Sequence, residues 1–255
     1  MTNRMVTLFF LGVMFFGGVM DLARGQTTKK PSLPKQEKEA RGVSFHIDHT
    51  IQEIEGWKVH VDKSLLSGEH EKLGEVALRV LSNKLYRISL IMPEDKLKKL
   101  RDVPIFLDRE HKLRAMQYHP GAGWLRRNGY STDMTKAVHI PRAEGLIRHE
   151  RNQDQQWVVL HELAHAYHDR ILSFDHKEIR SAYFRVKNAK LYESVRHIRG
   201  HKTRHYALTN PMEFFAEMTE SYFGTNDFYP FVRGELKEVD PKTYALLAKI
   251  WGKRR

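Results

Sequence analysis

The stretch DQQWVVLHELAHAYHDRIL, residues 154–172, decides how this chain is interpreted. Asp154 is a favourable N-cap residue, and the apolar side chains after it recur at helical spacing, so a helix is predicted over 154–172. Its buried side is expected to consist of Trp157, Leu160, Leu163, Ala164, Tyr167 and Ile171. His161 and His165 are four residues apart and therefore lie on one face of this helix.

Two imidazoles on one helical face can bind one metal ion, and Glu162 can face a water molecule on the same ion. The metal would lower the pKa of that water towards about 7, and the carboxylate would take its proton as it attacks a carbonyl. The chain has no cysteine, so a transition-metal site must use His, Asp and Glu. The alternative is a pair of partly buried histidines that hydrogen bonds satisfy without a metal.

A catalytic zinc site needs a third protein ligand, and two known spacings fail to supply it. The metzincin pattern requires glycine and histidine where this chain has His168 and Ile171. A glutamate nineteen residues after His165 would fall on Phe184. His168 itself lies about 10 Å along the helix axis from His161, too far to share an ion. Asp227, in an aspzincin-like Gly-Thr-Asn-Asp run, is too distant in sequence for that family's pattern.

The acidic stretch NPMEFFAEMTESYFG, residues 210–224, predicts a second helix with proline near its start and glycine just past its end. Glu213 and Glu217 share one face of it, and a glutamate on a helix crossing the first one would complete a His₂Glu site. The competing interpretations are a capping box between Asn210 and Glu213, and a solvated position for Glu217. Glu220 is expected on a solvated face.

The run from Tyr206 to Glu217, YALTNPMEFFAE, together with HELAH at 161–165, resembles the catalytic domains of anthrax lethal factor-like metallopeptidases, which are secreted bacterial enzymes. The resemblance is confined to about residues 157–224, and 47 residues separate His165 from Glu213. It implies a zincin fold that binds one Zn²⁺ per chain. It also implies roles for six residues: His161, His165 and Glu213 as zinc ligands, Glu162 as general base, Tyr206 as an oxyanion stabiliser or proton donor, and Glu217 as a carboxylate that orients a ligand histidine.

The chain divides into three segments by composition. Residues 1–25 have a basic start, an apolar run and small residues before Gln26, which is typical of a cleaved signal peptide. An uncleaved anchor is the alternative. Residues 26–42 are a polar linker with two prolines, and 43–255 are expected to form a single metallopeptidase domain. The protein is therefore expected in a secreted or extracytoplasmic location, without stable membrane insertion after cleavage.

The formal net charge of +12 is interpreted as solvated helix faces and turns. No basic-aromatic module is present, so a nucleic-acid partner is not expected. The expected partner is a peptide or protein substrate, and the sequence gives no indication of an oligomeric state.

Patterning predicts an α+β fold: a small, twisted, mainly antiparallel sheet packed on the active-site helix, followed by a helical C-terminal half. Strands are expected at 43–47, 57–61, 103–107, 115–119 and 137–140. Further helices are expected at 70–90, 93–100 and 241–251. Either 115–119 or 137–140 would be the edge that binds substrate, with His119 and His139 as pocket or structural residues and 121–124 as a cleft rim or hairpin turn.

These observations together indicate a secreted zinc-dependent endopeptidase. Three alternatives remain at this stage. The first is a catalytically inactive zincin-fold binding protein. The second is a zinc hydrolase acting on a non-peptide cell-wall amide, which the basic charge favours. The third is a secreted structural protein without a metal.

Overall fold

The computed structural model describes residues 47–252. The signal peptide expected at 1–25, the linker at 26–42 and most of the strand expected at 43–47 lie outside the described residues. Within the described part, no helix is both long and apolar enough to cross a membrane.

A five-stranded mixed sheet forms the first half of the fold, in the order β1-β2-β3-β5-β4. Its strands are β1 (His49–Ile54), β2 (Trp57–Asp62), β3 (Ile105–Leu107), β4 (Gln117–Tyr118) and β5 (Val138–Ile140). The outer pairs β1–β2 and β4–β5 are antiparallel, and the inner pairs β2–β3 and β3–β5 are parallel. The expectation of a mainly antiparallel sheet was wrong, because the chain crosses from β2 to β3 through two helices, and such crossovers join parallel strands.

Strand β1 was not predicted. It joins β2 through the two-residue turn Glu55-Gly56, and both turn residues have positive φ (51° and 88°), as tight hairpin turns of this kind require. Most of its side chains are exposed or half-buried because it lies at the edge of the sheet. An edge strand of this kind lacks the apolar alternation by which strands are recognised.

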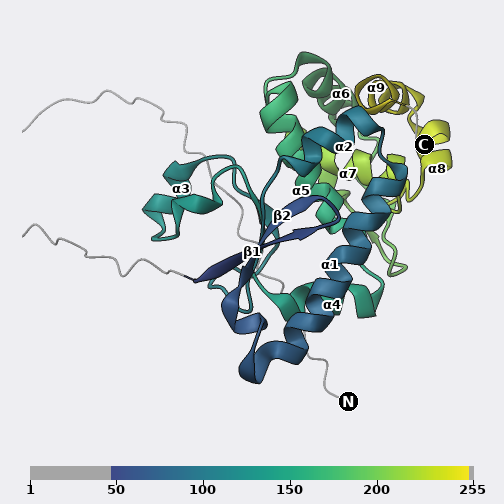
Figure 1. Cartoon of the computed structure of the whole chain (residues 1–255). Helices are drawn as coiled ribbons and strands as arrows, with labels where there is room; N and C mark the ends of the chain where they lie inside the picture. Colours follow the sequence, from purple (N-terminus) through teal and green to yellow (C-terminus); the bar gives the residue numbers. More distant parts are fainter. Residues whose placement is uncertain (1–46, 253–255) are drawn as a thin grey trace, which may run out of the picture. The chain divides into compact units, whose positions relative to one another are not determined.

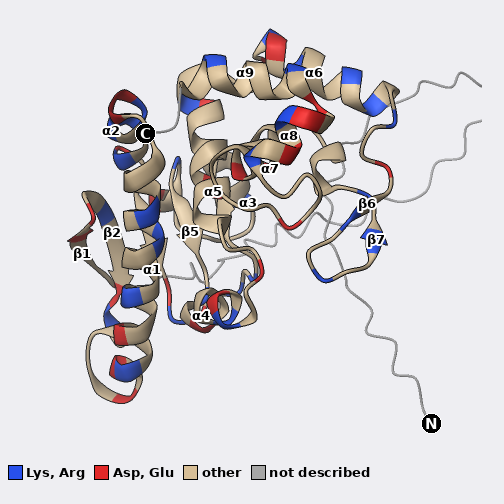
Figure 2. Ribbon diagram, turned by 90° about the vertical axis from the view of Figure 1, so that its right-hand side faces the viewer, with Lys and Arg blue, Asp and Glu red and all other residues tan. Residues whose placement is uncertain are grey.

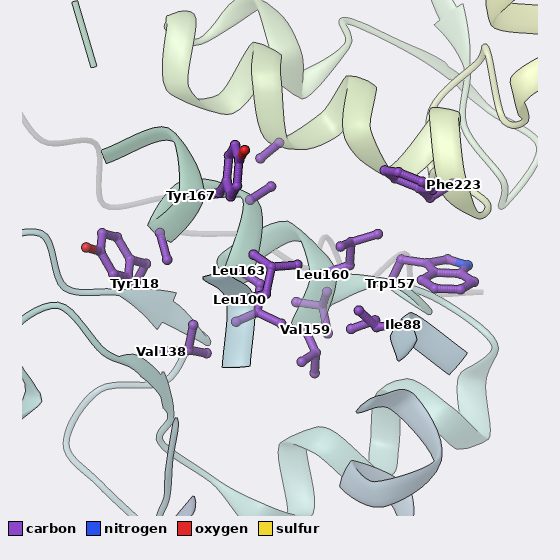
Figure 3. Close-up of a cluster of buried hydrophobic side chains, with 14 of the residues drawn as sticks. Ile88, Leu100, Tyr118, Val138, Trp157, Val159, Leu160, Leu163, Tyr167 and Phe223 are labelled. Carbon is purple, nitrogen blue, oxygen red and sulfur yellow. The ribbon is translucent and has the colours of Figure 1, made fainter. Parts of the chain in front are cut away.

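Three helices cover one face of the sheet: α1 (Glu71–Ile91), α2 (Glu94–Arg101) and α5 (Val158–Tyr167). Figure 3 shows Val159, Leu160 and Leu163 of α5 close to Leu100 and Val138. The opposite face carries a smaller apolar cluster that includes Phe106 and Leu125, the latter from α3 (Ala122–Arg127). The central strands β3 and β5 are therefore buried on both faces. α5 is fixed between the sheet and the helices that follow (Figure 1).

The second half is helical, as predicted. Its elements are α4 (Ala143–Asn152), the π-helical turn His168–Leu172 that extends α5, α6 (Lys177–Asn188), α7 (Pro211–Phe223), α8 (Arg233–Val239) and α9 (Pro241–Trp251). A short hairpin of β6 (Val195–Arg196) and β7 (Lys202–Thr203) and the 3-10 turn Tyr206–Leu208 connect α6 to α7.

Several predicted boundaries differ from the structure. The helix expected from Asp154 begins at Val158, because the Asp154 carboxylate accepts hydrogen bonds from His149 and Arg199 and does not cap the helix. The strand expected at 115–119 is shortened to Gln117–Tyr118. The hairpin-turn interpretation of 121–124 was wrong, since α3 begins at Ala122, and the cleft-rim interpretation stays a prediction.

Charged side chains lie mainly on outward-facing positions, as expected for solvated faces. Figure 2 shows lysine and arginine distributed along α1, α6 and the β6–β7 hairpin. An exception is Lys84 of α1, which is buried and donates to Glu150 Oε2 at 2.9 Å.

Candidate metal centre

All ten residues of α5 are buried, including the two histidines and the glutamate of its central motif. The sheet with α1 and α2 contacts one side of α5, and α7 contacts another. Trp157, just before α5, lies near Phe223 at the end of α7 (Figure 3). The apolar residues of α5 thus fix its rotation, so that His161 and His165 face α7.

The start of α7 brings a carboxylate to these histidines. Asn210 caps the helix, with its Oδ1 accepting from the backbone N–H of Glu213 at 2.8 Å. The capping interpretation is thus correct for the Asn210 side chain, whereas the Glu213 carboxylate contacts the histidines. Glu213 Oε2 lies 3.1 Å from His161 Nε2 and 3.3 Å from His165 Nε2.

The three donor atoms form a compact triangle, since the Nε2 atoms of His161 and His165 are themselves 3.1 Å apart. Ligands about 2.0–2.1 Å from a tetrahedral zinc ion lie about 3.3 Å from one another. The donor set of two imidazoles and one carboxylate, and its spacing, therefore fit a zinc ion. Burial acts to raise the pKa of Glu213, but the neighbouring His165 and His161 hold it well below its usual range.

Glu220 of α7 holds the far side of the His161 ring. Its Oε1 lies 2.7 Å from His161 Nδ1, so this nitrogen donates and Nε2 is left to accept a metal. The prediction of a solvated face for Glu220 was wrong, because α5, α6, α8 and α9 all pack on α7 and leave Glu220 6% exposed. The sequence did contain a signal: Glu213, Glu217 and Glu220 recur at the four- and three-residue steps of one helical face.

Glu217, predicted to orient a ligand histidine, lies further from His161. Its Oε1 is 3.6 Å from His161 Nδ1, while its Oε2 accepts from Asn226 Nδ2 at 2.9 Å. Burial and the nearby Glu220 raise the pKa of Glu217 to about 8. Burial likewise raises the pKa of Glu220. The backbone carbonyl and Oε2 of Glu217 both accept from Asn226 Nδ2, so Glu217 ties α7 to the loop that follows it.

The Glu162 carboxylate is positioned by the sheet. Its Oε2 accepts from the backbone N–H of Tyr118 in β4 at 2.8 Å, and the Tyr118 hydroxyl donates to Asp169 Oδ2 at 2.7 Å. β4 is thereby attached to α5 and to the π-helical turn that follows it. Burial raises the pKa of Glu162 above its ordinary value.

Tyr206 begins the 3-10 turn just before α7. The residues around it are buried: His205 stacks on Phe228, and its Nδ1 accepts from the backbone N–H of Ala207 at 3.1 Å. The Tyr206 side chain is partly exposed and makes no hydrogen bond among the described residues. Burial, with the nearby charge of Glu213, raises the pKa of Tyr206 to about 12, so its hydroxyl stays protonated near neutral pH.

Two other candidate ligands lie apart from this centre. His168 is buried against Phe174 and Phe215, and its ring nitrogens have no hydrogen-bond partner within the described chain. The Asp227 carboxylate accepts from the backbone N–H of Gln155 at 3.0 Å.

The structure also distinguishes between the two strands that were predicted as possible substrate-binding edges. β5 is paired on both sides, whereas β4 is an edge of the sheet and contacts α5. Of the two predicted segments, only 115–119 therefore lies at an edge of the sheet, where the backbone N–H of Tyr118 already donates to Glu162. His119 and His139 are both buried. This burial favours a structural role for them over a role as residues that line a substrate pocket beside α5.

Comparison with known proteins gives one match. A family model described as anthrax toxin lethal factor, N- and C-terminal domain, matches residues 51–250. No curated protein and no solved structure matches the chain significantly. The family match extends well beyond the 157–224 region in which the sequence motifs lie, and it includes most of β1 and all of β2 to β5.

Proposed function

The chain belongs to the anthrax toxin lethal factor family, and from this premise we propose that it is a secreted zinc-dependent endopeptidase. The observation that carries the proposal is the convergence of His161 Nε2, His165 Nε2 and Glu213 Oε2 within 4.8 Å of one another. These three side chains would hold one zinc ion per chain. The partner would be a peptide or protein substrate.

A zinc ion held there would supply Lewis-acid activation of a water molecule. Glu162 would take a proton from that water, since its raised pKa brings the carboxylate nearer to the working range of a general base. Tyr206, protonated near neutral pH, would donate a hydrogen bond to the oxyanion that develops on the substrate. β4, the edge strand beside α5, would bind the substrate backbone.

Metal content together with hydrolysis tests this proposal. Purified wild-type protein should contain about one equivalent of zinc at the α5 site, bound through Glu213. It should also cleave an unstructured protein such as casein. Glu213→Gln should lose that zinc and the activity. Glu162→Gln should keep the zinc and lose about 10²–10⁴-fold in kcat. The matched control is Glu238→Gln, which changes an exposed glutamate on α8. It should alter neither the zinc content nor the rate of hydrolysis.

Different outcomes would favour the alternatives. Zinc bound without cleavage of any unstructured protein would favour an inactive binding protein or an enzyme for a non-peptide amide. Retention of the full zinc content in Glu213→Gln would exclude Glu213 as a ligand.

We propose further that residues 1–25 act as a signal peptide and that 43–255 form one domain. The protein recovered from the culture medium or periplasm should then begin at Gln26 by N-terminal sequencing. A start at Met1 in that fraction would contradict cleavage.

A further inference from the structure

A second cluster of histidines lies on the face of the sheet that points away from α5. Side chains alternate along each strand, so Val138 and Ile140 join the main core while His139 points the other way. His139 is paired in register with Phe106, which is paired with His60. This row of ring side chains is separated by the sheet from His161 and His165.

At the centre of the cluster is the buried carboxylate of Asp108, directly after β3. Its Oδ2 lies 2.8 Å from His139 Nε2 and its Oδ1 lies 2.7 Å from His49 Nε2. The Asp108 side chain is 1% exposed, and among the described residues it forms no ion pair with a lysine or arginine. Buried charges in proteins are usually paired or coordinate a metal, and imidazole is the commonest protein ligand of transition metals.

Backbone hydrogen bonds fix the geometry of this cluster. The N–H of Asp108 donates to the Ile140 carbonyl at 2.9 Å, and the N–H of His111 donates to the Pro141 carbonyl at 2.8 Å. The loop after β3 is thereby held against the end of β5. One ligand atom each from Asp108, His111 and His139 lies within 4.8 Å of the others, a separation that one ion can bridge.

The remaining nitrogen of His139 is also held. Its Nδ1 lies 3.2 Å from His119 Nε2, so a hydrogen bond there would orient the ring with Nε2 directed at Asp108. Metal-binding histidines usually have their second nitrogen fixed in this way.

A cavity of about 300 Å³ adjoins the cluster. Its lining includes His49, His60, Phe106, Asp108, His111 and Asp133. An ion at the cluster would thus have buried protein ligands on one side and space for water or a small ligand on the other, as metal sites with an open coordination position do.

We propose that Asp108, His111 and His139 form a second metal site, which binds a divalent transition-metal ion and is best suited to zinc. Two imidazoles and one carboxylate are the donors that zinc accepts, and no thiolate is available to favour softer ions. The site is distinct from the one on α5 and does not depend on the peptidase proposal.

Metal titration of the metal-free whole chain tests the proposal. With Zn²⁺ as the probe, the wild type should bind two equivalents by calorimetry and by elemental analysis after dialysis. Asp108→Asn should bind one, and His165→Asn should also bind one. The double variant should bind none. Loss of a ligand should weaken the second equivalent more than about 100-fold, since even hydrogen-bonding partners of ligands contribute about 10–100-fold.

The matched control is Asp154→Asn. Asp154 is also a buried aspartate with a histidine partner, but Arg199 pairs with it, so its loss should leave both equivalents in place. If Asp108→Asn does not fold, His111→Gln in the His165→Asn background gives the same test, read from the visible spectrum of bound Co²⁺.

The outcomes separate the two sites. A single equivalent in the wild type that disappears in His165→Asn would overturn the second site and leave the first intact. A single equivalent that survives in His165→Asn and disappears in Asp108→Asn would support the second site against the first. Two equivalents retained in both Asp108→Asn and His111→Gln would overturn the assignment of these ligands.

Discussion

Glu220 and Glu217 are both buried carboxylates of α7, yet only Glu220 is within hydrogen-bonding distance of His161 Nδ1. Glu220→Gln should therefore weaken zinc binding at the α5 site by about 10–100-fold, because the amide is a poorer acceptor for the ligand histidine. Glu217→Gln should have a smaller effect, since its nearest polar partner is Asn226. Competition with a chelator of known affinity measures both. A larger loss in Glu217→Gln would restore Glu217 as the residue that orients His161.

Tyr206→Phe tests the proposed oxyanion donor. Removal of one such donor typically lowers kcat by about 10²–10³-fold, and the partly exposed ring should leave zinc content and KM nearly unchanged. Because the pKa of Tyr206 is raised to about 12, its deprotonation should not limit the rate at moderately alkaline pH. Steady-state kinetics across pH check both points. An unchanged kcat in Tyr206→Phe would remove the residue from the mechanism.

Trp157, at the start of α5, packs closely against Gly224, at the end of α7. A Cβ at Gly224, the residue that ends α7, would lie 2.1 Å from Trp157 Cε2. Gly224→Ala should therefore destabilise the protein by about 1–3 kcal/mol, the usual effect of overpacking, and should weaken zinc binding. Denaturant unfolding and zinc titration measure these effects.

The control for this substitution is Gly234→Ala in α8. A Cβ there has no neighbour within 4 Å, so alanine should stabilise the protein by about 0.4–1 kcal/mol. Equal effects of the two substitutions would mean that Gly224 is not placed against Trp157 as the structure has it.

Elements with strong local signals were predictable from the sequence. Asn210, Pro211 and Gly224 delimit α7, and Pro241 begins α9, because these residues have conformational preferences that act locally. α4 and α6 were not predicted, and α6 buries only Ile179, Tyr183 and Val186 on an otherwise polar helix. The parallel pairing of β2 with β3 depends on contacts distant in sequence, which strand patterns do not encode.

The same distinction applies to the candidate sites. The spacing of His161 and His165 on one helix, and the family motif containing Glu213, are visible in the sequence. The contact of Tyr118 with Glu162, and the cluster around Asp108, require strands to be placed beside one another, so they became visible only in the fold.

For the molecule as a whole, buried histidines should make stability depend on pH. Burial lowers the pKa of His168 from 6.5 to about 3, so the unfolded state takes up its proton more readily than the folded state. The free energy of unfolding is therefore at its full value above pH 6.5 and decreases as pH falls towards 3. At pH 5 a single such histidine lowers the free energy of unfolding by about 2 kcal/mol.

His168→Leu should reduce this loss, because leucine fills the same apolar site without titrating. Denaturant unfolding of metal-free protein at pH 7 and pH 5 measures the difference between the two conditions. His201→Leu is the control, since His201 is exposed. An identical decrease between pH 7 and pH 5 in wild type and His168→Leu would show that His168 does not contribute.

β4 consists of only two paired residues, yet it borders both candidate metal sites. Tyr118 donates to Glu162 on one face of the sheet, and the next residue, His119, approaches His139 on the other. A displacement of this short strand would change both contacts in one movement. Ligand binding on the two faces would then be thermodynamically linked, and each ligand would alter the affinity for the other by the same factor.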